Sequence, residues 1–257
     1  MILGIDVGNT HISFGCIEGD QVHGPMFRIP TDPKETEYGY AVRFREILKL
    51  NDIKIDDFSG VVISSVVPVV TGLLEKAVKL ITDAEVLVIA PGIKTGIKIA
   101  IDDPGTVAAD LIATAVGAAE YYPVPSFIID MGTATTITVV DENKAFRGGA
   151  ICPGLGTSLN ALTSGTSLLP AIEVSAPKNA VATNTVDCMK SGIVYGTAGS
   201  IDGILSAFEA EFGKPASIVC TGGMGKLISP YCKHEMIDDE ELLLRGLEVI
   251  WKRNHKS

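Results

Sequence analysis

Basic residues are scarce in this sequence. Its 257 residues contain 21 lysines and arginines against 31 aspartates and glutamates, a formal net charge of −10. A surface that binds nucleic acid needs clustered Lys and Arg, which displace counterions from phosphates. Only residues 251–256 are locally basic, and we interpret them as the solvated end of a helix. Nucleic acid is therefore excluded as a partner.

Long apolar runs are also missing. The most apolar stretch, residues 60–74, is interrupted by Ser64, Ser65, Pro68, Thr71 and Gly72. No segment has the roughly 20 apolar residues that a membrane-spanning helix needs, so we expect no membrane partner. A strand begins directly after Met1, which leaves no room for a signal peptide.

Cysteines are few and show no C-x-x-C spacing. The five are Cys16, Cys152, Cys188, Cys220 and Cys232. We interpret them as reduced thiols of a cytoplasmic protein without a zinc site. With 46% hydrophobic and 20% charged residues, the chain is expected to fold into one large or two ordinary globular domains.

The first 15 residues predict a hairpin with a ligand-binding turn. An apolar strand at 2–5 ends at Asp6, the turn 8–10 follows, and apolar residues then alternate from 12 to 16. A glycine lets the backbone approach a ligand closely, and amide and hydroxyl donors suit phosphate oxygens. The Asp6 carboxylate suits a hydrated Mg²⁺ or a water. Taken alone, the same residues also fit a plain hairpin with an Asn turn.

Residues 127–140 repeat this pattern about half a chain later. Another apolar strand ends at Asp130, and Gly132 and hydroxyl side chains precede an alternating strand. A repeat of this period predicts two similar domains, residues 1–122 and 123–257, whose hairpins face a shared cleft.

Periodicity also locates the other elements. In the first half we expect strands at 21–29, 60–65 and 86–89, and helices from a cap at Thr31 or Asp32 and from Pro68. In the second half we expect a strand at 145–151, a helix capped by Thr157 or Ser158, an irregular connection, and then, in order, a helix at 186–212, a strand at 217–221 and a closing helix at 238–251. This order favours mixed sheets flanked by helices.

Glycines recur along the predicted helix 186–212 at Gly192, Gly196, Gly199 and Gly203. Small residues along one stripe allow close helix packing, which we interpret as a contact with a symmetry mate.

Asp110 is a lone carboxylate in an alanine-rich helix predicted at 107–119. Burial without a partner would raise its pKa toward that of a working base. The alternative interpretation is an aspartate on the solvent face of an amphipathic helix.

Seven motifs appear in a characteristic order. They are Asp6-Val-Gly-Asn-Thr10 with Gly15, Gly92-x-x-Thr-Gly96, Asp110, Asp130-Met-Gly-Thr-Ala-Thr-Thr136, Gly148-Gly-Ala-Ile-x-Pro-Gly154, Asn184-Thr185 ahead of Ser191-Gly192, and Thr221-Gly-Gly223. Together they resemble the type III pantothenate kinases over nearly the whole chain. The resemblance implies an α/β fold of two ribonuclease-H-like domains, with mixed five-stranded sheets facing a central cleft, as in acetate and sugar kinases, Hsp70 and actin. It also implies the first step of coenzyme A synthesis, in which ATP and pantothenate give 4′-phosphopantothenate.

The resemblance also implies roles for individual residues. The residues expected to bind ATP are Asp6, Val7, Gly8, Asn9, Thr10, His11, Ile12, Ser13 and Thr133, and the turn at Gly222 and Gly223 is expected to approach the nucleoside. Those expected to bind pantothenate are Ala108, Ala109, Asp110, Leu111 and Thr185. Asp110 would be the proton acceptor, and Thr185 would reach the acceptor from the neighbouring subunit of a homodimer. Asp130 would hold K⁺ or NH₄⁺, and Asp6 would hold Mg²⁺ through water.

Three departures from the family pattern lie on the acceptor side. Leu111 stands where the family has arginine, Ile101 where it has tyrosine, and Lys190 where it has glutamine. The missing guanidinium removes a bidentate partner for a carboxylate. Two alternatives therefore stay open: a kinase of the same fold for another small hydroxyl compound, and a non-catalytic ATP-binding regulator.

Overall fold

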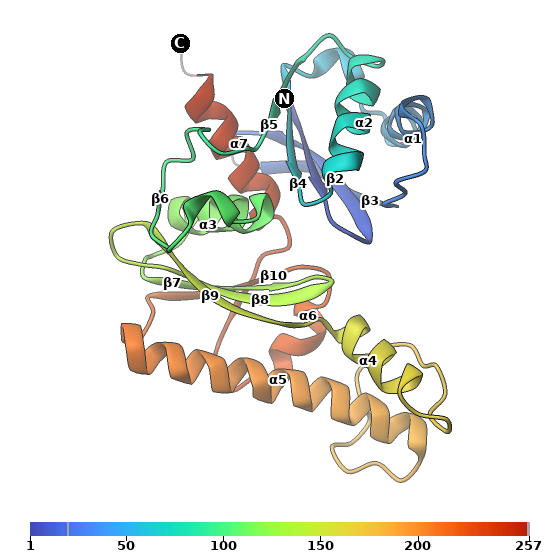
Figure 1. The fold of residues 1–257 in the computed structure, drawn as a ribbon, viewed down its shortest axis with the longest axis vertical. Coiled ribbons are helices and arrows are strands. Elements are labelled where there is room, and N and C mark those ends of the chain that lie inside the picture. Colours follow the sequence, from blue (N-terminus) through green and yellow to red (C-terminus); the bar gives the residue numbers. More distant parts are fainter. Residues whose placement is uncertain (20, 256–257) are drawn as a thin grey trace. The chain divides into compact units, whose positions relative to one another are not determined.

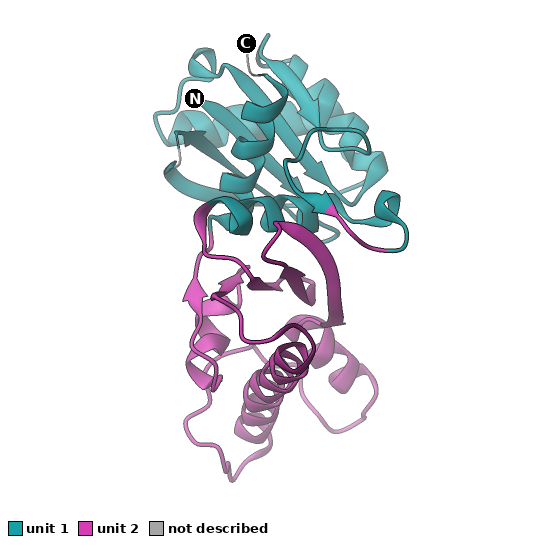
Figure 2. Ribbon diagram, turned by 90° about the vertical axis from the view of Figure 1, so that its left-hand side faces the viewer, with its two compact units in different colours: residues 1–98, 102–120, 241–257 teal, residues 99–101, 121–240 magenta. Residues whose placement is uncertain are grey.

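The computed structural model describes residues 1–19 and 21–255 and divides the chain into two compact units (Figure 2). Unit 1 comprises residues 1–98, 102–120 and 241–257, and unit 2 comprises residues 99–101 and 121–240. The division therefore differs from contiguous domains 1–122 and 123–257, because the last helix returns to the first unit. Within the described residues, no helix is both long enough and apolar enough to cross a membrane.

A five-stranded mixed sheet forms the centre of unit 1. Its order is β3-β2-β1-β4-β5, and its strands are β1 (Ile2–Val7), β2 (His11–Glu18), β3 (Gln21–Pro30), β4 (Gly60–Ser65) and β5 (Glu85–Val88). Strand β1 is antiparallel to β2 and parallel to β4. The apolar runs at 2–5 and 60–65 thus lie side by side, as expected for strands covered on both faces.

Helices cover both faces of this sheet. On one face, α1 (Glu37–Leu50) and α2 (Pro68–Lys79) enclose a core that includes Ile5, Phe14 and Phe44. On the other face, α7 (Leu242–Asn254) packs so closely that a side chain at Gly4 or Gly15 would meet Leu244. Helix α3 (Ala109–Tyr121) packs on α7, with the backbones in contact at the two small residues Gly117 and Gly246.

The sheet of unit 2 repeats the same plan with one added strand. Its order is β11-β10-β7-β8-β9-β6, and its strands are β6 (Lys98–Ile99), β7 (Ser126–Met131), β8 (Ala134–Val140), β9 (Ala145–Pro153), β10 (Ser217–Thr221) and β11 (Ile237–Asp238). Strands β7 to β11 correspond to β1 to β5 in order and direction. The duplication is confirmed, but the second sheet has six strands and not five, because two-residue β6 extends the edge beside β9.

The helices of unit 2 are α4 (Leu155–Ser164), α5 (Thr185–Phe212) and α6 (Gly225–Ile228). Figure 1 shows α5 lying along one face of the sheet. Its residues Val194, Ile201 and Leu205 form a core with Phe127 and Ile129 of β7. Three short 3₁₀ turns complete the chain: η1 (Ile55–Asp57), η2 (Pro104–Thr106) and η3 (Ser229–Tyr231).

Several helix boundaries differ from the predicted ones. Helix α1 begins at Glu37, where the Thr36 hydroxyl accepts from the Gly39 amide at 3.1 Å, and not at Thr31 or Asp32. Helix α4 begins at Leu155, so Thr157 and Ser158 lie inside it and not at its cap. Asp238 belongs to β11, and the closing helix starts at Leu242 with no acid in its first turn.

Candidate active site

The β1–β2 hairpin carries a tight turn at residues 8–10. The Gly8 amide donates to the His11 carbonyl at 3.0 Å, and Asn9, Thr10 and His11 are exposed. Thr31 also stabilises the turn, because its hydroxyl donates a hydrogen bond to the Gly8 carbonyl at 2.7 Å. The turn therefore presents polar groups to solvent on a braced backbone.

Asp6 lies at the end of β1, beside a buried serine that the sequence reading did not single out. The Ser64 hydroxyl donates to Asp6 Oδ1 at 2.8 Å, and Ser64 is 0% exposed. This hydrogen bond fixes the orientation of the carboxylate. A serine in an otherwise apolar strand was the sequence signal for this contact.

Asp110 lies in the first turn of α3, not in its middle, because η2 and residues 107–108 precede the helix. Its side chain is half-buried and accepts from the Leu111 amide at 2.7 Å. Burial raises the pKa of Asp110, and the Leu111 hydrogen bond opposes that rise. Burial outweighs that hydrogen bond, so the pKa of Asp110 lies above the usual aspartate value.

The residues next to Asp110 are also buried or half-buried. Ala109 is buried, whereas Ala108 and Leu111 are half-buried beside Asp110. The short alanine side chains leave room around the carboxyl.

The second hairpin brings three expected residues together within unit 2. The Gly132 amide donates to the Ala134 carbonyl at 3.0 Å, which closes a turn like that of Gly8. Gly222 has a φ of +85°, and a Cβ there would lie 2.7 Å from Asp130 Oδ1 and from the Met131 backbone. The glycine turn after β10 thus lies directly against Asp130, which explains why a residue with a side chain does not fit.

Thr133 is exposed at the tip of this hairpin, and its backbone is held by the segment after β9. The Gly154 amide and the Thr157 hydroxyl donate to the Thr133 carbonyl at 3.2 and 2.9 Å. A Cβ at Gly154 would collide with the carbonyls of Gly132 and Thr133. Gly154 of the Pro-Gly motif therefore packs closely against the hairpin turn and stabilises it.

A second feature, to which sequence reasoning assigned no role, lies beside Asp130. Thr136 is directly opposite Asp130 on β8, and Thr221 is opposite it on β10. The Thr136 hydroxyl is buried and has no hydrogen-bond partner within the described residues. A buried hydroxyl without a partner is costly, and here its oxygen lies on the same face as a carboxylate.

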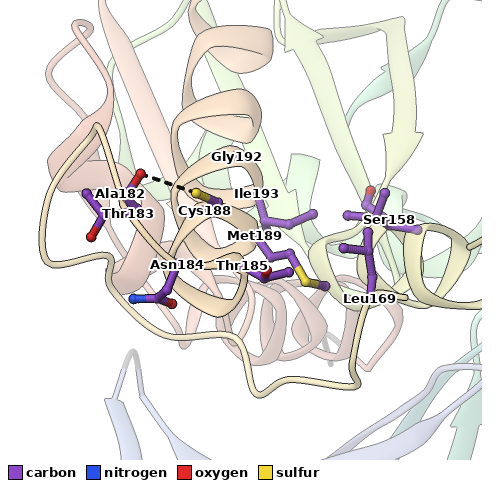
Figure 3. A pocket seen from close by; sticks show the side chains of 11 residues that line it. Ser158, Leu169, Ala182, Thr183, Asn184, Thr185, Cys188, Met189, Gly192 and Ile193 are labelled. Atoms are coloured by element: carbon purple, nitrogen blue, oxygen red, sulfur yellow. Dashed lines mark hydrogen bonds between the residues drawn. The ribbon is translucent and has the colours of Figure 1, made fainter. Parts of the chain in front are cut away.

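Thr185 does not lie at either hairpin. It is the first residue of α5, after the cap Asn184, whose side chain accepts from the Asp187 amide at 2.9 Å. Figure 3 shows both residues at the rim of a cavity of about 810 Å³ between α4, the 165–184 connection and α5. Leu162, Leu169, Met189 and Ile193 make much of its lining apolar.

Comparison with solved structures shows which fold this chain shares. The chain superposes on component A of the (R)-2-hydroxyglutaryl-CoA dehydratase from Acidaminococcus fermentans with a TM-score of 0.57, at 16% identity over 99% of this chain and 98% of that one. It superposes on the inorganic polyphosphate/ATP-glucomannokinase from an Arthrobacter species with a TM-score of 0.51, at 16% identity over 98% of each chain. Such low identity establishes the fold alone, the duplicated fold of the acetate and sugar kinases and actin.

Sequence comparison identifies the family within this class. The model of the family described as type III pantothenate kinase matches residues 2–207. The type III pantothenate kinase of Halalkalibacterium halodurans is 40% identical over 99% of this chain and 100% of its own length. The chain belongs to the type III pantothenate kinase family.

Proposed function

We propose that this chain transfers the γ-phosphoryl group of ATP to pantothenate and so forms 4′-phosphopantothenate, the first step of coenzyme A synthesis. The observation that carries the proposal is full-length similarity to a type III pantothenate kinase at 40% identity. The duplicated hairpins and the raised pKa of Asp110 support it from the structure.

The nucleotide binds to both hairpins in this proposal. Residues 6–13 and Thr133 contact the phosphates through amides and hydroxyls, and Gly222 and Gly223 approach the nucleoside. The exposed turn residues and the close approach of Gly222 to Asp130 support these roles.

Asp110 acts as the general base. The pantothenate hydroxyl oxygen forms a bond to the γ-phosphorus, the bond from that phosphorus to the β,γ-bridging oxygen breaks, and ADP leaves. The hydroxyl proton passes to Asp110, whose raised pKa suits a base better than that of an exposed aspartate.

The chain's oxygen donors fit the two cations that the family implies. Mg²⁺ is commonly held by one or two carboxylates, substrate phosphates and waters, and Asp6, oriented by Ser64, supplies such a carboxylate. For K⁺, Asp130 supplies a carboxylate and Thr136 supplies a hydroxyl oxygen with no other partner in the described chain. When bound, the cations neutralise phosphate charge.

Changing Thr136 to valine tests the monovalent-cation site. The substitution keeps the shape and removes one oxygen, so the K⁺ concentration for half-maximal activity should rise about threefold to tenfold, as expected for one lost polar contact. Thr135→Val is the matched control, because the Thr135 hydroxyl is also buried and without a hydrogen-bond partner in the described residues but points to the opposite face. Equal effects of the two variants on K⁺ activation would contradict this site.

Changing Gly222 to alanine tests the close turn beside Asp130. Gly213 is the matched control, since its φ is also positive (+81°) but a Cβ there meets nothing within 4 Å. Both variants should lose about 1–3 kcal/mol of folding stability, because an alanine is strained at a positive φ. Only Gly222→Ala should raise the KM for ATP, by about tenfold, because only there does the methyl group displace Asp130 or Met131. An unchanged KM for ATP in Gly222→Ala would show that this turn is not part of the nucleotide site.

The active assembly in this proposal is a homodimer built on α5. A Cβ at Gly192, Gly196, Gly199 or Gly203 would meet nothing within 4 Å, so this helix face is open in one protomer. Large apolar side chains of the connection ahead of α5 are also exposed, with Leu168 at 90% and Val181 at 86%. A second copy covers this surface and supplies Thr185 to the acceptor site.

Coupled detection of ADP with a panel of acceptors tests the proposal against its alternatives. Release that depends on pantothenate supports it, and release only with another small alcohol favours a related kinase despite the shared family. Leu111 is the observation behind that second candidate, because it gives the acceptor carboxylate no cation beside Asp110. ATP binding without turnover of any acceptor would indicate a regulator.

The protein works in the cytoplasm in this proposal. All five cysteines are free thiols. Burial raises the pKa of Cys16 to about 11 and that of Cys220 to about 12. Both therefore stay protonated and unreactive at neutral pH.

A further inference from the structure

The N-terminal hairpin lacks a cation of its own. Residues 6–13 contain no lysine or arginine, and their one ionised side chain is the negative Asp6. Phosphoryl transfer depends mainly on positioning and charge neutralisation, which usually include a lysine or arginine near the phosphates. Arg28 is the first lysine or arginine in the whole chain, and it lies on β3, the strand next to the hairpin.

Strand register places Arg28 in line with the hairpin residues. Ser13 on β2 is opposite Asp6 on β1 and opposite Arg28 on β3, and Asp6 is also opposite Ser64 on β4. Residues directly opposite in a sheet project to the same face. One row of side chains across four strands of unit 1 therefore contains Arg28, Ser13, Asp6 and Ser64. Figure 1 shows these strands side by side.

This row lies on the face away from the α1–α2 core. The neighbours of Arg28 on β3, Phe27 and Ile29, are buried in that core, so Arg28 points to the opposite face. On that face Leu244 of α7 covers Gly4 and Gly15. Gly4 lies two residues before Asp6 on β1, and Gly15 lies two residues after Ser13 on β2, so both are on the same face of the sheet as the row. Arg28 itself is exposed.

The guanidinium has no acidic partner in the described part of the chain. Arg43, Arg45 and Arg253 of unit 1 pair with Glu35, Glu46 and Glu120, and Arg28 takes part in none of these ion pairs. An arginine held on a strand with no carboxylate of its own is available to an incoming anion.

His11 does not replace Arg28 as the cation. It is the diagonal neighbour of Arg28, since His11 is opposite Pro30 on β3. Loss of hydration and the nearby charge of Arg28 both lower the pKa of His11, which disfavours a positive charge on its ring. The strong fixed positive charge at this hairpin is therefore that of Arg28.

We infer that Arg28 is a further ATP-binding residue, whose guanidinium contacts the phosphate chain beside residues 8–13. The inference rests on the proposed function only in taking ATP as the nucleotide. Arg28 adds a charge-assisted hydrogen bond to the phosphates, which the neutral amide and hydroxyl donors of residues 8–13 cannot provide.

The test compares Arg28→Ala, Arg28→Lys and Arg45→Ala in the full chain. Arg45 is the matched control, because it is an exposed arginine on α1 of the same unit whose pairing with Glu46 spans 3.7 Å at the surface. Loss of a charged hydrogen bond should raise the KM for ATP about tenfold to a hundredfold in Arg28→Ala. Arg28→Lys should recover part of this loss, whereas the KM for pantothenate should stay within about twofold of wild type.

Calorimetric titration with ATP in the absence of acceptor separates this inference from the proposed function. Weaker ATP binding by Arg28→Ala, with wild-type binding by Arg45→Ala, supports the inference whether or not pantothenate is phosphorylated. Unchanged ATP affinity in Arg28→Ala overturns it, as does an effect confined to the KM for pantothenate. A wild-type protein that binds ATP but leaves pantothenate unchanged refutes the proposed function alone.

Discussion

Asp110→Asn should lower the turnover of ATP with pantothenate by about a hundredfold to ten-thousandfold, the usual contribution of a general base. The amide keeps the shape of the side chain but cannot accept the hydroxyl proton. The KM for ATP should change by no more than about twofold, because in this account Asp110 does not hold the nucleotide. Steady-state assays of ADP release measure both quantities.

A stability measurement excludes unfolding as the cause of that loss. Burial raises the pKa of Asp110 above its unfolded value, so the ionised carboxyl destabilises the fold as pH rises through that interval. Asp110→Asn should therefore melt at or above the wild-type temperature at pH 7, and the difference should vanish near about pH 3, where both states are protonated. Asp83→Asn, at an exposed position of the same unit, should leave activity unchanged. Full turnover in Asp110→Asn would require a different base.

Gly196→Glu should convert the proposed homodimer to monomers and reduce the catalytic efficiency with pantothenate about tenfold or more. Since nothing lies within 4 Å of a Cβ at Gly196 in one protomer, the substitution leaves the single chain intact but places a charge in the centre of the proposed interface. The loss of activity follows because Thr185 of the neighbouring subunit no longer reaches the acceptor. Analytical ultracentrifugation and the kinetic assay measure the two effects.

Gly72→Glu is the control for that experiment. Gly72 is also an exposed helical glycine whose Cβ would meet nothing within 4 Å, but it lies on α2 of unit 1. It should stay dimeric and active. A Gly196→Glu protein that remains a dimer at micromolar concentration would place the interface elsewhere.

Local patterns were sufficient to predict the hairpins and most elements. Both Asp-x-Gly turns follow apolar strands, so neighbouring residues alone specify them. Strand β4 and helix α2 were predicted from a buried apolar run and from Pro68 at a helix start. The start of α1 was missed because Thr31 looks like a cap but its hydroxyl bonds to the distant Gly8.

Features that depend on contacts between distant segments escaped the sequence reading. Strand β6 has only two residues, too few for any period, and it exists because Ala100 and its neighbours bond along β9. Helix α7 belongs to unit 1 because its side chains pack against Gly4, Gly15 and Gly60, which lie nearly 200 residues or more earlier in the chain.

The same limit applies to the candidate site. Asp6, Asp110 and Asp130 were predicted from motifs, whereas Ser64, Thr136 and Arg28 depend on strand register across the sheets. Register cannot be read from one strand alone, because it depends on which strand becomes its neighbour and in which alignment.

The most direct test of the central claim is identification of the product by ³¹P NMR after incubating the purified protein with ATP, Mg²⁺, K⁺ and pantothenate. A phosphomonoester of pantothenate should appear in step with ADP, and it should be absent with Asp110→Asn over the same time. ADP that accumulates with inorganic phosphate and without that ester, or no consumption of ATP at all, would contradict the account.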